Sequence, residues 1–281
     1  MQQAPVLPAD LATQVRLALA EDVGDGDITA ELIDSASVVT AQIKSRESAV
    51  LCGKAWVDCT FQTLDPSLQI DWRVADGELI HNNQSLVSLR GSARAILTGE
   101  RTALNFLQTL SATATVSRRY AELIAHTPAR ILDTRKTLPG LRTAQKYAVR
   151  VGGCDNHRMG LFDAFLIKEN HIAACGGIGA AISRARALGT GKNIEIEVQD
   201  LDELQQALLA QPDIIMLDNF SLEDIAAAVA LNQGRVKLEA SGGIDDSTLV
   251  KIAESGVDYV SIGALTKHCR AIDFTLLVDT A

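Results

Sequence analysis

The sequence contains few aromatic residues, and this scarcity limits how its core can be built. Only 4% of the 281 residues are aromatic, whereas 47% are hydrophobic, so Val, Ile, Leu and Ala must fill the interior. These side chains are typical of parallel sheets and barrel interiors. At this length the chain can bury one large core or two modest ones. We therefore expect a globular protein of the α/β class.

Three further features are missing. The sequence has no run of about 18 apolar residues that could span a membrane, and its N-terminus lacks the basic start and apolar block of a signal peptide. The five cysteines are odd in number and form no C-x-x-C pair, which argues against a disulfide framework or a zinc knuckle. These absences predict a cytoplasmic protein with reduced thiols and no membrane partner.

The net charge is −9, and nucleic-acid binding favours a broadly basic surface instead. Residues 133–171 depart from this balance, because they contain seven Lys or Arg residues against four Asp or Glu residues. A cationic cluster on an acidic protein suits one small polyanion held in a cleft. We expect a small-molecule substrate and no nucleic-acid partner.

The first part of the chain reads as a small α+β domain. An amphipathic helix is expected near residues 10–20, followed by short alternating segments such as 38–44 and 69–74. A longer helical pattern over residues 98–127 connects this region to the next. The expected domains are an N-terminal α+β domain at 1–112, a β/α barrel at 113–269, and a C-terminal segment, 270–281, that returns to the N-terminal domain.

From residue 130 onward, short apolar strands alternate with helical segments. The strands are predicted at 130–132, 164–167, 194–198, 214–217, 236–238 and 259–262. A possible short strand at 156–158 gives seven at most. Parallel strands joined by right-handed crossovers follow from this alternation. We predict an irregular or open seven-stranded β/α barrel of the TIM type, with the smaller N-terminal α+β domain beside it.

Polar residues follow each predicted strand. In a β/α barrel the carboxyl ends of the strands open on one face, where such barrels place their chemistry. The residues at these ends are Asp133-Thr134-Arg135-Lys136, Lys168-Glu169-Asn170-His171, Glu197, Asp218-Asn219, Glu239-Ala240-Ser241-Gly242-Gly243 and Gly263-Ala264.

The last two strands end in glycine-containing turns. Ser241, Gly242, Gly243, Gly263 and Ala264 precede helical segments, so their backbone N–H groups can approach a phosphate. The alternative is that these glycines only make tight turns. Two successive strands with the same feature favour a phosphate site.

Glu197 and Asp218 end successive strands, so two carboxylates would lie side by side and repel each other unless a cation relieves them. Mg²⁺ is the natural cation, because it binds one or two carboxylates together with water and substrate phosphate oxygens. The alternative is a structural role in ion pairs with Lys168 or Lys237.

The cations of the cluster, considered together with Arg101 from outside it, fall into two groups. Arg135, Arg158 and Arg101 can each bind a carboxylate through two N–H groups, whereas Lys136 and Lys168 act as point charges. Together they would suit a dicarboxylate. The remaining cations of the cluster are expected on the solvated face of a helix, outside the site, at Arg142, Lys146 and Arg150.

Two other features have simpler interpretations. Cys154 has no identifiable base and is expected to be a packing residue, not a nucleophile. The acidic stretch EDVGDGDIT at residues 21–29 lacks the ligand spacing of an EF-hand, so we expect a turn that ends a helix.

Several long motifs resemble those of the quinolinate phosphoribosyltransferase family. They are, in order, GERTALNFLQTLS, LDTRKTLPGLRTAQKYAV, GGCDNHRMGLFDAFLIKENHI, IEIEV, IIMLDNF, LEASGGI and SIGALTKH. The resemblance runs from residue 21 almost to the C-terminus. It implies that quinolinate and phosphoribosyl pyrophosphate become nicotinate mononucleotide, pyrophosphate and CO₂, with Mg²⁺ as cofactor, in NAD biosynthesis.

The resemblance also implies residue roles. The quinolinate pocket would contain Thr134, Arg135, Lys136, His157, Arg158 and Lys168, with Arg101 contributed by the partner subunit of a homodimer. Glu197 and Asp218 would face the ribose and the Mg²⁺-diphosphate, and the two glycine turns would bind the 5′-phosphate. The catalytic residues would be Lys136, Lys168, Glu197 and Asp218. Two departures from the family pattern, Gln199 and Cys154, touch none of these roles.

Three rival functions remain open from the residues. A phosphoribosyltransferase for a related pyridine or azole acid would use the same cleft. A Schiff-base barrel aldolase would use Lys168 as its nucleophile. A catalytically inactive sensor of the NAD pathway would bind the same ligands without releasing CO₂.

Overall fold

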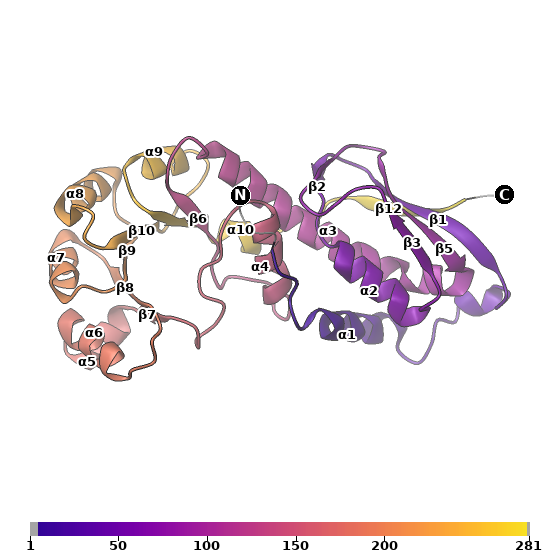
Figure 1. The fold of residues 1–281 in the computed structure, drawn as a ribbon, viewed down its shortest axis with the longest axis horizontal. Coiled ribbons are helices and arrows are strands. Elements are labelled where there is room, and N and C mark those ends of the chain that lie inside the picture. The colour runs from indigo at the N-terminus through magenta and orange to yellow at the C-terminus, as the bar shows by residue number, and fades with distance from the viewer. Residues whose placement is uncertain (1–4, 280–281) are drawn as a thin grey trace. The chain divides into compact units, whose positions relative to one another are not determined.

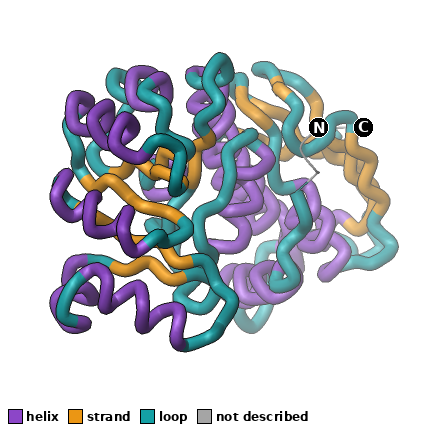
Figure 2. Tube along the Cα trace, turned by 60° about the vertical axis from the view of Figure 1, so that its left-hand side comes forward, coloured by secondary structure: helices purple, strands orange, loops and turns teal. Residues whose placement is uncertain are grey.

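A computed structural model describes residues 5–279 of the chain. These residues form two compact units, and neither unit is continuous in sequence. The N-terminal unit contains residues 5–118, 137–153 and 265–279, and the strand–helix unit contains residues 119–136 and 154–264. Figures 1 and 2 trace the chain through both.

A four-stranded antiparallel sheet forms one layer of the N-terminal unit. Its strand order is β12-β1-β5-β3, with β1 at Val38–Ser45, β3 at Gln69–Trp72, β5 at Ser85–Ser92 and β12 at Phe274–Val278. A small second sheet pairs β2, Ala49–Val50, with β4, Leu79–Ile80. Burial alternates along the second half of β1, as expected for a sheet that buries one face.

The N-terminal unit also contains helices. They are α1 (Leu11–Val23), the 3₁₀ helix η1 (Ala30–Leu32), α2 (Lys54–Leu64), α3 (Ala93–Leu123), α4 (Arg142–Val151) and α10 (Ala264–Lys267). The sheet and the helices share a core that contains Phe61 of α2 and Leu104 and Leu107 of α3. The helices predicted near residues 10–20 and 98–127 are confirmed as α1 and α3, and α3 runs from the N-terminal unit into the strand–helix unit.

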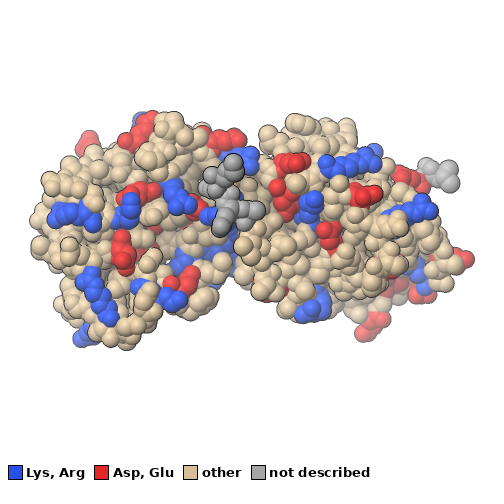
Figure 3. All heavy atoms as spheres, in the orientation of Figure 1, with Lys and Arg blue, Asp and Glu red and all other residues tan. Residues whose placement is uncertain are grey.

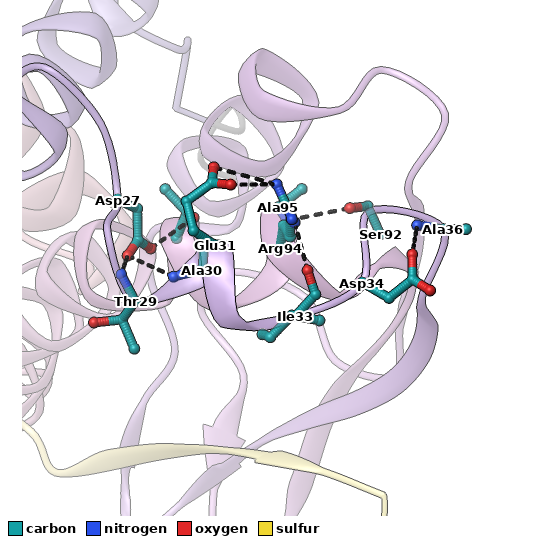
Figure 4. Close-up of polar contacts among 11 residues, drawn as sticks. Asp27, Thr29, Ala30, Glu31, Ile33, Asp34, Ala36, Ser92, Arg94 and Ala95 are labelled. Carbon is teal, nitrogen blue, oxygen red and sulfur yellow. Dashed lines mark hydrogen bonds and ion pairs between the residues drawn. The ribbon is translucent and has the colours of Figure 1, made fainter.

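Side-chain contacts fix the segment between α1 and β1 (Figure 4). The Asp27 carboxylate accepts a hydrogen bond from the Ala30 backbone N–H at 3.0 Å and from the Thr98 hydroxyl at 2.8 Å. These hydrogen bonds lower the pKa of Asp27, with that from Ala30 contributing most. Arg94 forms an ion pair with Glu31 at 3.2 Å. The acidic stretch after α1 is therefore a turn, as predicted.

Helix α4 belongs to the core of the N-terminal unit. Ala144 and Ala148 lie in its second hydrophobic cluster, Lys146 is fully buried, and Arg142 and Arg150 are half-buried. The prediction that these three cations form a solvated face is therefore wrong. The four-residue spacing of the cations identified a helix, but it carried no information about what packs against that helix.

Six parallel strands form the sheet of the strand–helix unit, in the order β6-β11-β10-β9-β8-β7. They are β6 (Arg130–Leu132), β7 (Phe165–Ile167), β8 (Ile194–Val198), β9 (Ile214–Asp218), β10 (Lys237–Ser241) and β11 (Tyr259–Ser261). All six predicted apolar strands are present, and two of them have the predicted bounds. The α/β class and the parallel arrangement are confirmed.

Helices cover the outer side of this sheet, and the strands follow an arc inside them (Figures 1 and 2). These helices are α5 (Glu169–Cys175), α6 (Ile178–Ala187), α7 (Leu201–Ala210), α8 (Leu222–Asn232) and α9 (Leu249–Glu254). Asp200 and Ser221 cap α7 and α8 by accepting hydrogen bonds from the third backbone N–H of each helix.

The possible seventh strand at 156–158 is absent, and a single parallel bridge between Leu132 and Asp155 stands in its place. The Asp133 carboxylate explains this local structure. It accepts hydrogen bonds from the His157 backbone N–H at 2.9 Å and from the Asn156 side-chain amide at 2.7 Å. Because a side chain satisfies this backbone, it needs no neighbouring strand.

Both signs of charge are interspersed on the molecular face that Figure 3 shows. Such a mixture differs from the broadly basic surface typical of nucleic-acid binding. Among the helices of residues 5–279, none has both the length and the apolar character required to cross a bilayer.

Candidate active site

One face of the parallel sheet is polar. Glu195 and Glu197 alternate with apolar residues along β8, and every residue of this strand is buried. Successive strand residues point to opposite faces, so the two glutamates share a face. Met216 lies opposite both Glu197 and Glu239 in the strand register, and Asp218 follows two residues after Met216. All four carboxyl groups therefore point to the same side of the sheet. Parallel sheets are usually apolar on both faces, so buried acids indicate a functional site.

Two of these glutamates surround His157. The His157 Nε2 atom lies 2.9 Å from the Glu195 carboxylate and 3.6 Å from the Glu239 carboxylate. Burial raises the pKa of Glu239 to about 8, the negative charge of Glu195 adds to the rise, and His157 opposes it. Near neutral pH this cluster therefore holds one carboxyl group that tends to keep its proton.

Two guanidinium groups lie near this cluster. Burial lowers the pKa of Arg158, the positive charge of Arg135 lowers it further, and the Glu195 carboxylate acts in the opposite direction. The Nε atom of Arg135 is buried and has no hydrogen-bond partner. A buried N–H donor without an acceptor is costly. An anionic ligand between the two arginines would supply that acceptor.

The structure brings Lys136 beside the end of β11. A Cβ atom added at Gly263 would lie 3.0 Å from Lys136 Cδ and 3.6 Å from Thr134 Oγ1. A larger residue at position 263 would press on the lysine side chain, so glycine gives the lysine room. The Lys136 backbone N–H donates to the Thr134 hydroxyl at 3.1 Å. Ala264, half-buried, comes next and begins α10.

Lys168 forms an ion pair with Glu197 across β7 and β8. The Lys168 side chain is 46% exposed, whereas that of Glu197 is only 10% exposed. The structural alternative considered for Glu197, an ion pair with Lys168, is therefore present. Lys237 pairs with Asp258 instead, at 2.6 Å.

The turn after β10 is shaped by two glycines and by Asn219. Gly242 and Gly243 follow Ser241 with φ values of +100° and +60°, which side chains rarely adopt. A Cβ atom at Gly242 would lie 2.1 Å from Asn219 Oδ1 and 2.9 Å from the Asn219 backbone nitrogen. The Asn219 amide also donates to Asp218 Oδ2 at 3.0 Å. The Asn219 side chain therefore contacts both this turn and the Asp218 carboxylate at the end of β9.

A pocket of about 380 Å³ opens beyond the carboxyl ends of β8 and β9. Its lining residues are Gln199, Asp200, Leu201, Asp202, Asn219, Phe220 and Asp224. The pocket adjoins Glu197 and Asp218 along the chain. Because three of its lining residues are aspartates, it suits a ligand that carries a cation better than a bare anion.

None of the contacts described above involves Arg101 or Cys154. Arg101 is exposed on α3 in the N-terminal unit, and its predicted role depends on a second chain. Cys154 is buried, and burial raises the pKa of its thiol to about 12. The burial of Cys154 agrees with its interpretation as a packing residue, and the raised pKa disfavours the reactive thiolate.

Sequence reasoning misplaced one residue and overlooked another. Glu239 was expected after the fifth apolar strand, but β10 extends to Ser241 and pairs with a strand on each side. Glu239 is therefore fully buried inside the sheet. Glu195 received no role. The signal was available in IEIEV, because charged residues at every second position of a buried parallel strand indicate a polar site.

A parallel α/β sheet with these groups on one face defines a class of protein. Paired guanidinium groups suit carboxylates, glycine turns suit a phosphate, and adjacent carboxylates suit a divalent cation. The arrangement is that of an enzyme acting on a small, phosphorylated, anionic substrate.

The chain belongs to the quinolinate phosphoribosyl transferase family. Residues 27–111 match the N-terminal domain of this family, and residues 113–277 match its C-terminal domain. Both matches lie in the order expected along the chain.

Proteins similar to this chain carry related names. A nicotinate-nucleotide pyrophosphorylase [carboxylating] of Mycobacterium leprae is 41% identical over 272 residues, covering 93% of this chain and 95% of the relative. A probable enzyme of the same name from Bacillus subtilis is 39% identical, with coverages of 91% and 89%. The solved structure of the nicotinate-nucleotide pyrophosphorylase from Francisella tularensis is 50% identical, with a TM-score of 0.94 and coverages of 99% and 100%.

Proposed function

We propose that the protein transfers the phosphoribosyl group of phosphoribosyl pyrophosphate to the ring nitrogen of quinolinate. The products would be nicotinate mononucleotide, pyrophosphate and CO₂, in the synthesis of NAD. The observation that carries this proposal is the family match over both parts of the chain. The polar sheet face also has side chains suited to the carboxylates, the phosphate and the diphosphate of the two substrates.

The two carboxylates of quinolinate require cations. Arg135 and Arg158 lie close enough to influence each other's charge, and the buried Nε of Arg135 lacks an acceptor. Both observations support a carboxylate between them. Lys136 and Lys168 would add positive charge from β6 and β7. His157 adjoins Arg158 and would line the same pocket.

The phosphate of the ribose would bind at the ends of β10 and β11. Gly242 and Gly243 are exposed residues in a turn that other residues rarely form, and Ser241 offers a hydroxyl beside them. Gly263 and Ala264 follow the neighbouring strand. Lys136 passes beside Gly263, so one lysine could serve the phosphate turn and the dicarboxylate pocket.

Glu197 and Asp218 fit a magnesium ion. Their carboxylates point to the same face of the sheet, and carboxylate oxygens are the ligands that Mg²⁺ prefers, with water and diphosphate oxygens completing its coordination. Bound there, the ion would neutralise charge that develops on the departing diphosphate. Glu197 already pairs with Lys168. Its carboxylate would therefore contact both the Lys168 ammonium group and the ion.

The residues on the sheet face would act by positioning and by charge. The pyridine nitrogen attacks the anomeric carbon as the bond to the diphosphate breaks, and Arg135 and Arg158 would hold the ring for this attack. The electron pair of the breaking C–CO₂ bond then flows toward the positively charged ring nitrogen, and a proton replaces the lost carboxylate. The Lys136 and Lys168 ammonium groups would stabilise the negative charges involved.

The ion pair of Lys168 weighs against the aldolase alternative. A Schiff-base lysine must present a neutral amine to a carbonyl substrate. The Lys168 nitrogen is instead engaged in an ion pair with Glu197, so it is not free to attack a carbonyl group.

The assembly and the location extend this proposal. The strands of the strand–helix unit would form the wall of an open β/α barrel, and Arg101 of the partner subunit would complete the site of a homodimer. The exposed position of Arg101 supports that role. All five cysteines are free thiols, which supports a reducing compartment such as the cytoplasm.

The test is turnover of quinolinate with phosphoribosyl pyrophosphate and Mg²⁺, followed by identification of the product. Nicotinate mononucleotide is the expected product. If no pyridine nucleotide forms, or if another pyridine or azole acid is preferred, the proposal is wrong.

A further inference from the structure

Glu195 and Glu239 have no part in the reaction above, yet they lie at the centre of the polar sheet face. Glu195 is 3% exposed and Glu239 is fully buried. Glu195 Oε1 and both carboxylate oxygens of Glu239 have no hydrogen-bond partner of normal geometry. Burying a carboxyl group without hydrogen bonds costs free energy. Their presence therefore calls for a role that compensates for this cost.

Both nitrogens of the His157 ring are directed at protein groups. Nδ1 accepts a hydrogen bond from the Arg158 backbone N–H at 2.7 Å. An accepting nitrogen carries no proton, so the ring proton is on Nε2. Nε2 lies 2.9 Å from the Glu195 carboxylate and 3.6 Å from the Glu239 carboxylate, close to both but without hydrogen-bond geometry to either. The His157 side chain is only 10% exposed, so these contacts hold it from both sides.

The backbone before Arg158 is fixed as well. The buried Asp133 carboxylate accepts a hydrogen bond from the His157 N–H at 2.9 Å. Arg158 then extends its guanidinium group toward Ala164, whose carbonyl oxygen lies 3.4 Å from Nη1. His157, which contacts the Arg158 backbone N–H, therefore contacts groups on three strands or strand ends: Asp133 after β6, Glu195 on β8 and Glu239 on β10.

We propose that Glu195 and Glu239 are positioning residues for the dicarboxylate pocket. They hold the His157 ring in its Nε2–H tautomer, and the Nδ1 contact with the Arg158 backbone then keeps that arginine beside Arg135. The proposal deepens the proposed function and rests on it for the identity of the substrate. His157 thus serves the pocket chiefly by holding Arg158.

Charge supports this arrangement. Glu195 favours the charged form of Arg158, whereas burial and Arg135 disfavour it. Two ionised carboxylates this close would repel each other. The raised pKa of Glu239 allows that carboxyl group to keep its proton beside Glu195.

Steady-state kinetics of Glu195→Gln and Glu239→Gln test the proposal. Glutamine has nearly the same shape and cannot ionise, so neither substitution leaves a new unpaired charge in the sheet and both variants are expected to fold. The KM for quinolinate should rise by about 10- to 100-fold, the loss typical when a positioning contact is removed. The KM for phosphoribosyl pyrophosphate and kcat should change little. An unchanged KM for quinolinate in both variants would overturn the proposal.

The matched control is Glu254→Gln. Glu254 also lies 2.9 Å from a histidine Nε2, that of His126, but both side chains are more than half exposed. Removing this contact should leave both KM values unchanged. If the control raised the KM for quinolinate as much as Glu239→Gln, the effect would not come from the buried cluster, and the proposal would fail.

NMR of protein labelled with ¹⁵N-histidine gives a second readout, which does not require turnover. The His157 resonances are identified by their loss in His157→Gln. The neutral Nε2–H tautomer is expected in the unsubstituted protein, and a mixture of ring states is expected in Glu195→Gln and Glu239→Gln. A charged ring or an Nδ1–H tautomer in the unsubstituted protein would overturn the proposal. If quinolinate is not a substrate, the proposed function is wrong. The spectra then still show whether Glu195 and Glu239 hold the His157 ring in one state.

Calorimetric titration with Zn²⁺ distinguishes a metal site, because His157, Glu195 and Glu239 place their ligand atoms within 4.8 Å of one another. The proposal predicts no zinc binding that depends on Glu239. Stoichiometric binding that is lost in Glu239→Gln would instead assign the cluster to a metal and overturn the positioning role.

Discussion

Substitution of Lys168 by alanine should lower stability as well as abolish turnover, because the two members of its ion pair differ in exposure. Glu197 is 10% exposed and Lys168 is 46% exposed. Lys168→Ala leaves a largely buried carboxylate without its partner. Breaking a fully buried pair costs about 3–5 kcal/mol. Solvent reaches this pair through Lys168, so we reduce the expected cost to about 1–2 kcal/mol.

Substitution of the other member of the ion pair, Glu197, should lower stability less. Glu197→Gln leaves an ammonium group that water can solvate, so the expected loss is below about 1 kcal/mol. Turnover should still be abolished, since the proposed metal ligand is gone. Lys237→Ala is the matched control, because Lys237 pairs with Asp258 at 2.6 Å on a more exposed part of the same sheet. It should retain activity and lose at most about 1 kcal/mol.

Thermal unfolding and turnover of quinolinate, measured on the same preparations, check these expectations. One kcal/mol corresponds to about 2–4 °C in the unfolding midpoint for domains of 150–250 residues. Lys168→Ala should therefore unfold roughly 2–8 °C below the unsubstituted protein. The reasoning is refuted if Lys168→Ala is as stable as Lys237→Ala, and the catalytic role of Lys168 is refuted if it is as active.

Three further predictions follow from the site. Gly242→Ala should raise the KM for phosphoribosyl pyrophosphate by more than tenfold, because its Cβ would strike both the side chain and the backbone of Asn219; an unchanged KM would exclude this turn from phosphate binding. Burial raises the pKa of Glu239 from 4.5 to about 8, so the folded state binds more protons than the unfolded state. Its contribution to stability should fall as the pH rises through that range, and a pH series of denaturant titrations should lack this slope in Glu239→Gln. Removal of divalent cations with a chelator should abolish turnover and Mg²⁺ should restore it, whereas full activity in the chelator would contradict the role of Glu197 and Asp218.

The strands of the parallel sheet could be predicted because their apolar runs are short and well separated. The strands at 130–132 and 194–198 have the predicted bounds. The end of β10 could not be predicted, because LEAS reads as a polar turn. Its pairing with strands on both sides keeps Glu239 inside the sheet, and such pairing is a tertiary property that local sequence does not carry.

Tertiary packing also explains the two other failures. Lys146 reads as a surface residue at helical spacing, but α4 packs into the core of the N-terminal unit and buries it. The possible strand at 156–158 fails because the Asp133 side chain takes the hydrogen bonds that a neighbouring strand would provide. Lys168 and Glu197 were predicted at successive strand ends, and the structure joins them in an ion pair. Lys136 and Gly263 were predicted after the first and the last strand, and they come close only because β6 pairs with β11 in the sheet.

The measurement that tests the central claim most directly is the release of CO₂ and pyrophosphate from quinolinate, with nicotinate as the matched substrate. Nicotinate lacks the carboxylate beside the ring nitrogen, so the pair isolates the decarboxylating step. With quinolinate and phosphoribosyl pyrophosphate, we predict equal amounts of CO₂, pyrophosphate and nicotinate mononucleotide, and no comparable turnover of nicotinate. Efficient use of nicotinate, or pyrophosphate release from quinolinate without CO₂, would contradict the account.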